Sequence, residues 1–259
     1  MAKNPLDYSA PLDINLTISD ELAERVYDAI AVSGNRESRI PQLQVLLSNV
    51  ISNHITDPDL YIAVSQDNSA YKPKSRYNSL SIGKSFVSLL KTMSDHGWLE
   101  LHRGFLDRNT GISRRSRIKA TQKLLELLEK LEALSRLVAY APNTECIILR
   151  NEDKRNIEYE DTTNEINRRR NLTDYNNKLH KTLITHPTFP TEGVRMKNDQ
   201  MFRINPADKF VRRIYNRSSF EWNGRFYGGW WQHIPKEYRK PIHPAGPWLR
   251  SDQVYRSPR

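Results

Sequence analysis

The chain has 259 residues, 37% of them hydrophobic and 27% charged, and its formal net charge is +10. Positive charge in this excess favours a polyanionic partner such as nucleic acid, because each phosphate contact releases bound counterions. No apolar run is long enough to span a membrane, and the N-terminus lacks the apolar centre of a signal peptide. We therefore expect a cytoplasmic, nucleoid-associated protein that has no membrane partner.

Residues 1–40 are predicted to form an extended arm followed by a helix. Ser19 stands directly before Asp20 and Glu21, so its hydroxyl can cap the helix while the two carboxylates suit the positive helix end. Apolar residues then recur every four positions, which predicts one buried stripe made of Leu22, Val26 and Ile30. Gly34 and Asn35 are predicted to end this helix.

Residues 41–140 carry the strongest pattern in the chain. Their predicted elements follow the order helix, strand, helix, strand, turn, strand, helix, which is typical of a winged helix-turn-helix domain. These elements are a helix from Pro41 to about His54, a strand at 60–64, a polar loop at 66–78, a helix from Ser81 to His96 that Gly97 ends, strands at 98–102 and 112–119 around a turn at 108–111, and a leucine-rich helix from Ala120 to about Val138.

The helix that begins at Ser81 and the hairpin after it form the candidate DNA-binding surface. The exposed side of the helix offers groups that reach phosphates and base edges when a helix lies in the major groove: Lys84, Ser85, Ser88 and Lys91. On the hairpin, basic residues stand against Asp107 alone: Arg103, Arg108, Arg114, Arg115, Arg117 and Lys119. Such a wing can contact the DNA backbone or a narrow minor groove. The alternative is a solvated edge hairpin whose charge prevents aggregation.

The leucine-rich helix allows two interpretations. Its apolar side consists of leucines at helical spacing: Leu124, Leu127, Leu128, Leu131, Leu134 and Leu137. These residues either belong to the core or form the seam of a homodimer through residues 120–138, because the repeat is too short to define a coiled coil.

The second half of the chain has a different composition. Residues 141–194 are rich in charge and poor in apolar residues, which predicts a charged linker or a surface helix. Residues 195–259 are basic and aromatic and are predicted to be poorly ordered. One run in this segment either stacks on unpaired bases of single-stranded DNA or belongs to a core, namely Arg225, Phe226, Tyr227, Trp230 and Trp231.

No complete active site can be recognised. The single cysteine, Cys146, excludes an intrachain disulfide and a cysteine-rich zinc site, and its apolar neighbours predict a half-buried residue rather than a nucleophile. The histidines show no metal-binding spacing. We therefore predict that the protein is not an enzyme and has no catalytic residue, metal or cofactor.

Two resemblances extend this interpretation, the first of them over residues 41–137. Gly-Trp-Leu-Glu at 97–100, Arg-Gly-Phe at 103–105, Thr-Gly at 110–111 and Arg-Ile-Lys-Ala-Thr at 117–121 follow one another at short spacing. This stretch resembles the winged-helix domains of bacterial plasmid and phage replication proteins. The resemblance implies a recognition helix and a wing that bind DNA.

The second resemblance lies in the C-terminal part. Gly-Arg-Phe-Tyr-Gly-Gly-Trp-Trp at 224–231, Ile-Pro at 234–235 and Arg-Lys at 239–240 are similar to a segment of uncharacterised bacterial proteins associated with mobile elements. In that family the segment leads into a strand that resembles the metal-binding aspartate strand of DNA polymerases. Here His-Pro-Ala-Gly follows at 243–246, and Asp252 is the only later acid. The comparison implies a truncated or frameshifted form without the paired carboxylates of a two-metal site.

Taken together, these patterns predict a mainly α protein with a small β-hairpin, built from a winged helix-turn-helix domain and a poorly ordered basic C-terminal segment. Its expected function is double-stranded DNA binding in the replication or maintenance of a mobile element. The alternatives are a winged-helix transcriptional regulator and a truncated polymerase-like or primase-like protein that lacks its catalytic carboxylates.

Overall fold

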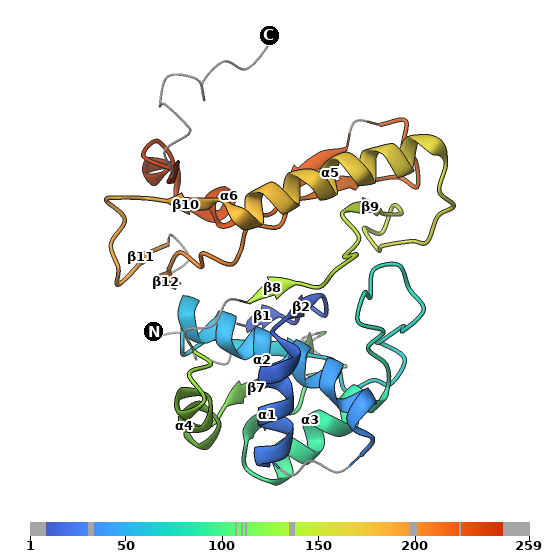
Figure 1. Ribbon diagram of the computed structural model, residues 1–259. Helices are drawn as coiled ribbons and strands as arrows, with labels where there is room; N and C mark the ends of the chain where they lie inside the picture. The colour runs from blue at the N-terminus through green and yellow to red at the C-terminus, as the bar shows by residue number, and fades with distance from the viewer. Residues whose placement is uncertain are drawn as a thin grey trace. The chain divides into compact units, whose positions relative to one another are not determined.

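The computed structural model describes residues 9–30, 34–106, 108, 109, 111, 113–134, 138–196, 201–222 and 224–245 (Figure 1). The chain divides into two compact units, Met1–Thr144 and Glu145–Arg259. With 35% helix and 20% strand in several small sheets, the fold is mixed α/β. The predicted mainly α class was wrong, because short strands such as Ile147–Leu149 pair only with segments distant in the chain and leave little local periodicity.

The N-terminal unit begins with two short strands and two helices. Strands β1 (Ser9–Pro11) and β2 (Leu16–Thr17) precede helix α1 (Asp20–Ile30). As predicted, the Ser19 hydroxyl caps α1, accepting a hydrogen bond from the Leu22 amide at 3.3 Å. The predicted apolar stripe of α1 is buried.

Helix α2 spans Arg36–Thr56 and supplies much of the core of this unit. It begins five residues before the predicted start, because Asn35 caps it by accepting a hydrogen bond from the Glu37 amide at 2.9 Å. Pro41 therefore lies inside the helix and does not start it. Its buried apolar residues include Leu43, Leu46, Leu47, Val50 and Ile51.

A four-stranded sheet with the order β1-β3-β7-β4 packs on these helices. Its strands β3 (Tyr61–Val64) and β4 (Leu99–His102) match the predicted strands, whereas β7 (Ser116–Ala120) is only the second part of the strand predicted at 112–119. The strand β7 lies between β3 and β4 and is antiparallel to both, so that Ile118 pairs with Ile62 on one side and with Leu101 on the other. The helix between β3 and β4, and the hairpin between β4 and β7, are thereby held at the edges of one small core.

Helix α3 spans Ser85–Asp95 and buries Phe86, Leu89, Leu90 and Met93. It begins later than predicted, because Ser81 has a φ of +51°, which no right-handed helix contains. Gly97 ends it as predicted, with a φ of +72°. The amide of Gly97 donates to the carbonyl of Ser94, and that of Trp98 to the carbonyl of Met93, which is the hydrogen-bond pattern of a Schellman motif.

Replacing Gly97 by alanine should lower the free energy of unfolding by about 1 kcal/mol, because a left-handed backbone disfavours any Cβ. Apart from the glycine and its two chain neighbours, no atom of the described residues lies within 4 Å of the position that a Cβ would take, so the cost is conformational rather than steric. Gly97→Asn should cost less, since asparagine tolerates this conformation. Urea denaturation of both variants measures the difference, and equal losses would contradict this explanation.

Helix α4 spans only Gln122–Lys130, shorter than the predicted leucine-rich helix. Glu132 has a φ of +55° and ends α4 in a second Schellman motif, in which the Ala133 amide donates to the Leu128 carbonyl at 2.7 Å. Leu124 and Leu128 are fully buried, as the core interpretation expects. Residues 135–137 lie outside the described residues, and the homodimer through 120–138 stays a prediction.

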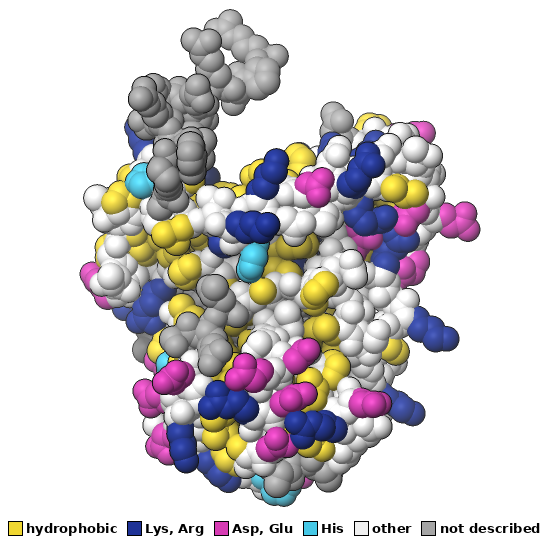
Figure 2. All heavy atoms as spheres, in the orientation of Figure 1, with side chains coloured by type: hydrophobic (Ala, Val, Ile, Leu, Met, Phe, Trp, Pro, Cys, Tyr) yellow, Lys and Arg dark blue, Asp and Glu magenta, His cyan; other side chains and the backbone are white. Residues whose placement is uncertain are grey.

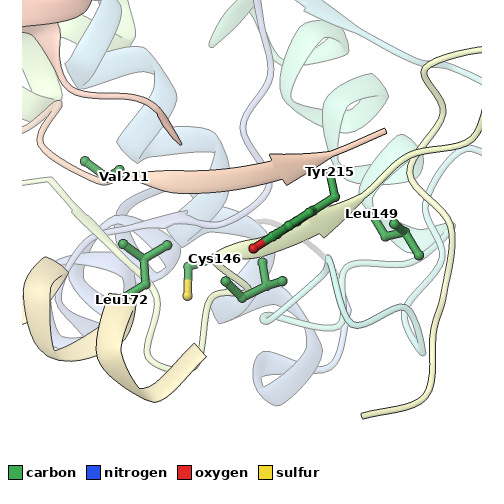
Figure 3. Close-up of a cluster of buried hydrophobic side chains, with 6 residues drawn as sticks. Cys146, Leu149, Leu172, Val211 and Tyr215 are labelled. Carbon is green, nitrogen blue, oxygen red and sulfur yellow. The ribbon is translucent and has the colours of Figure 1, made fainter. Parts of the chain in front are cut away.

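The C-terminal unit is built on a three-stranded sheet with the order β14-β13-β9. Strand β13 (Arg212–Tyr215) runs parallel to β9 (Ile147–Leu149) and antiparallel to β14 (Arg225–Tyr227). Helix α5 (Thr163–Lys181) lies along this sheet (Figure 1). Figure 3 shows the core between them, in which Leu172 of α5 lies near Cys146 and Val211.

Smaller elements complete this unit. They are the paired strands β10 (Leu183–Thr185) and β15 (His243–Ala245), the paired strands β11 (Val194–Arg195) and β12 (Met201–Phe202), the short helix α6 (Trp230–His233) and the 3-10 helix η2 (Lys236–Tyr238). Residues 141–194 thus include the surface helix that was one of their two interpretations, α5, and the segment from 195 onward is described at 195–196, 201–222 and 224–245. Residues 246–259 lie outside the described residues.

Candidate nucleic-acid interface

The hairpin between β4 and β7 is the predicted wing, and its strands are β5 (Phe105–Leu106) and β6 (Ser113–Arg114). Gly104 lies at the base of the hairpin, where the two sides of the hairpin approach each other closely. A Cβ at this position would lie 2.4 Å from the carbonyl oxygen of Arg114, and the Gly104 amide donates to the Ser116 hydroxyl at 2.9 Å. The glycine therefore allows the hairpin to close directly above the sheet.

Most of the arginines predicted on the wing are exposed, namely Arg103, Arg108, Arg114 and Arg115. The guanidinium of Arg114 lies 6.0 Å from the centre of the Phe105 ring on the paired strand. Phe105 and Leu106 are also exposed, so the described part of the wing presents both positive charge and apolar surface. Asp107, the predicted acidic exception, lies outside the described residues.

The predicted residues of α3 have two different roles. Lys91 is exposed and lies away from the buried face of the helix, and Lys84, the exposed N-cap residue, directly precedes it. Ser85 and Ser88 are also exposed but contact α2: the Ser85 hydroxyl accepts from Gln42 at 2.7 Å, and the Ser88 hydroxyl accepts from Arg39 at 3.2 Å. These two serines therefore fix α3 to α2.

Sequence reasoning missed the role of Arg39 in this contact. Its guanidinium also donates to the Ser85 carbonyl and to Gln42, both at 2.9 Å, and the residue is only 9% exposed. Burial lowers the pKa of Arg39. The signal available in the sequence was the pair Arg39 and Gln42, which lie three positions apart directly before the apolar residues of α2.

Tyr71 connects the base of the wing to α3. Its ring packs edge-to-face on Phe86 at 5.3 Å between centres, and its hydroxyl donates to the Ser65 carbonyl at 3.1 Å. Burial raises the pKa of Tyr71, and the charge of Arg115 on the wing acts on it in the opposite direction. Ser65 borders the same hollow as Arg114 and Arg115, so Tyr71 contacts both a residue at the base of the wing and Phe86 of α3.

Two other residues predicted to bind DNA lie on the central strand of the sheet. Arg117 is only 8% exposed and lies on the central strand β7, between its register partners Ala63 of β3 and His102 of β4. Lys119 forms an ion pair with Asp59 at 3.0 Å and lies 5.7 Å from the centre of the Tyr61 ring. A pattern of basic residues along a hairpin does not reveal which of them belong to the central strand of the sheet.

The predicted stacking residues are also divided by the structure. Arg225, Phe226 and Tyr227 are exposed on the edge strand β14, and Trp231 is half-buried. Trp230 is 1% exposed and belongs to the core, which is one of the two interpretations that the sequence left open. Trp230 is the first residue of helix α6, and its ring packs edge-to-face on the ring of Trp231.

The remaining chemistry of the described residues is limited. Among them, no group of three or more histidine, cysteine, aspartate or glutamate side chains could hold a metal ion. None of the helices in the described ranges is both long and apolar enough to cross a membrane. Over α1 and α2, the face of the N-terminal unit seen in Figure 2 mixes acidic and basic side chains. No family model, curated protein or solved structure matches the chain.

Proposed function

We propose that the protein binds double-stranded DNA through α3 and the wing, in the replication or maintenance of a mobile element on the bacterial nucleoid. The observation that carries this proposal is the set of exposed basic residues on two adjoining elements of one scaffold: Lys84, Lys91, Arg103, Arg108, Arg114 and Arg115. Their charges fit phosphates, and few residues of opposite sign lie between them in the sequence.

The arrangement of the scaffold supports the same proposal. A helix precedes β4, a hairpin joins β4 to β7, and β7 lies between β3 and β4. In winged-helix proteins such a helix enters the major groove, and the hairpin contacts the neighbouring backbone or minor groove. Tyr71 contacts Phe86 of α3 with its ring and Ser65 beside the base of the wing with its hydroxyl, which supports contact of both elements with one duplex.

The double variant Arg114→Ala, Arg115→Ala tests the proposal. Fluorescence anisotropy with a labelled duplex of mixed sequence, between about 50 and 200 mM salt, should show weaker binding. The slope of log affinity against log salt should become shallower by about 2, because two phosphate contacts are lost. Arg117 is left unchanged, since its replacement would disturb the sheet.

The matched control is Arg25→Ala, Lys130→Ala. It removes two exposed positive charges from the same unit, one on α1 and one on α4. If binding depends on the wing rather than on net charge, this control keeps nearly the affinity and salt slope of the original chain. Equal losses in the two double variants, or no duplex binding by the original chain, would contradict the proposal.

A further inference from the structure

A cavity of about 480 Å³ opens in the C-terminal unit between α5 and the sheet β14-β13-β9. The helix contributes residues at positions i, i+3, i+4 and i+7, which form one stripe: Arg168, Asn171, Leu172 and Tyr175. The sheet contributes Arg213 and Phe226, which are direct cross-strand partners, and α6 contributes Trp231 and Gln232. The volume falls in the range of small-molecule sites.

Hydrogen bonds and an ion pair fix the position of α5 relative to the sheet. The Asn176 amide group donates to the Val211 carbonyl at 2.9 Å, and the Val211 amide donates back to Asn176 at 2.8 Å. Arg169 donates to both carboxylate oxygens of Glu145 at 3.0 Å, beside the start of β9. The cavity is therefore formed before any ligand arrives.

The charge inside the cavity is positive. None of the described residues that line it is acidic. Arg168 is paired with Glu165 at 2.8 Å, whereas no carboxylate among the described residues forms an ion pair with Arg213. The Arg213 guanidinium lies instead 5.2 Å from the centres of both the Tyr215 and Phe226 rings. Two ring contacts orient its N–H groups, and a fixed, unneutralised guanidinium is suited to a phosphate.

The other residues that line the cavity suit a flat aromatic group that carries hydrogen-bonding atoms at its edge. Phe226 is 54% exposed and Tyr175 is 48% exposed, although both rings border the cavity. Such rings provide stacking surfaces for a nucleobase. The Gln232 carbonyl oxygen accepts from the Gly228 amide at 3.2 Å, which leaves its NH₂ group to donate to a base edge.

From this combination we infer that the cavity binds one unpaired nucleotide, with its phosphate on Arg213 and its base against Phe226 and Tyr175. The nucleotide can be free or can be part of a single strand, because both present the same phosphate and base. The inference does not depend on the duplex-binding surface of α3 and the wing, since every residue of the cavity belongs to the other unit.

Two matched pairs of variants test this site on the full chain. Phe226→Ala is compared with Tyr227→Ala, which removes the next exposed ring of the same strand outside the cavity. Arg213→Gln is compared with Arg212→Gln, which removes the neighbouring charge of β13 outside the cavity. Thermal unfolding confirms that each variant is folded.

Binding is measured by anisotropy with a labelled oligothymidylate of about ten nucleotides. All variants also carry Arg114→Ala and Arg115→Ala, so that the wing does not contribute. We expect Phe226→Ala and Arg213→Gln to weaken binding about ten-fold, as loss of one stacked base or one phosphate contact does, while their controls bind nearly as the parent does.

Competition by dTMP or dAMP identifies the source of the nucleotide. Displacement of the oligonucleotide shows that the cavity accepts a free nucleotide, and binding without such displacement shows that it accepts a strand; both outcomes support the site. Equal effects within each matched pair, or no binding of either probe by the folded parent, overturn the inference. Duplex binding by the chain with an intact wing is measured separately, so a failure here leaves the proposed function unaffected.

Discussion

Replacing Arg169 by alanine should lower the stability of the C-terminal unit by about 3 kcal/mol, the largest loss that we expect from a single substitution. Glu145 is only 6% exposed as a side chain, and Arg169 neutralises it through two hydrogen bonds of 3.0 Å. The same guanidinium donates to Asp161 at 2.6 Å and to the Tyr159 hydroxyl at 3.1 Å. Truncation would leave a carboxylate buried without its counter-charge.

Hydrogen exchange in peptides from α5 and β9 measures this loss within the unit. Arg170→Ala is the matched control, because Arg170 is the next residue of α5, is exposed, and donates to Asn167 on the same helix. Its stability should change by less than about 0.5 kcal/mol. Adding Glu145→Gln to Arg169→Ala should recover part of the loss, since the buried charge is then removed. Similar losses for Arg169→Ala and Arg170→Ala would contradict a structural role for the ion-pair network.

Replacing Arg39 by alanine should lower the stability of the N-terminal unit by about 2–3 kcal/mol and weaken duplex binding as well. The buried guanidinium links α2 to the Ser85 carbonyl and the Ser88 hydroxyl of α3. Its loss removes partners from several polar groups at once and frees the first turns of α3. Amides of α3 should then exchange faster, and the helix that carries Lys84 and Lys91 is no longer held in one orientation.

The matched control for Arg39 is Arg36→Ala on the same helix. Arg36 is exposed and pairs at the surface with Asp28 at 2.7 Å and Glu24 at 3.5 Å, and this pairing raises the pKa of its guanidinium. Surface ion pairs contribute little to stability, so this variant should unfold and bind DNA nearly as the original chain does. If Arg39→Ala leaves both stability and duplex affinity intact, the proposed coupling of α2 to α3 is wrong.

Local patterns predicted most of the N-terminal unit correctly. The Ser19 cap, the stripe of α1, the strands β3 and β4, and the end of α3 at Gly97 all depend on residues within a few positions of one another. The candidate surface was predicted less completely. Residue type and spacing identified the wing and its exposed arginines, but they could not separate these from Arg117, whose burial depends on which strand becomes central.

By itself, the sequence determined the cap of α1 at Ser19, the end of α3 at Gly97, and the concentration of positive charge between Arg103 and Lys119. These features arise from hydrogen bonds and periodicities that act between near neighbours. Only the tertiary structure decided that β9 pairs with β13, that α5 covers their sheet, and that Arg213 and Phe226 meet Tyr175 at one cavity. Such contacts join segments far apart in the chain, and they depend on which apolar faces can be buried together rather than on any local preference.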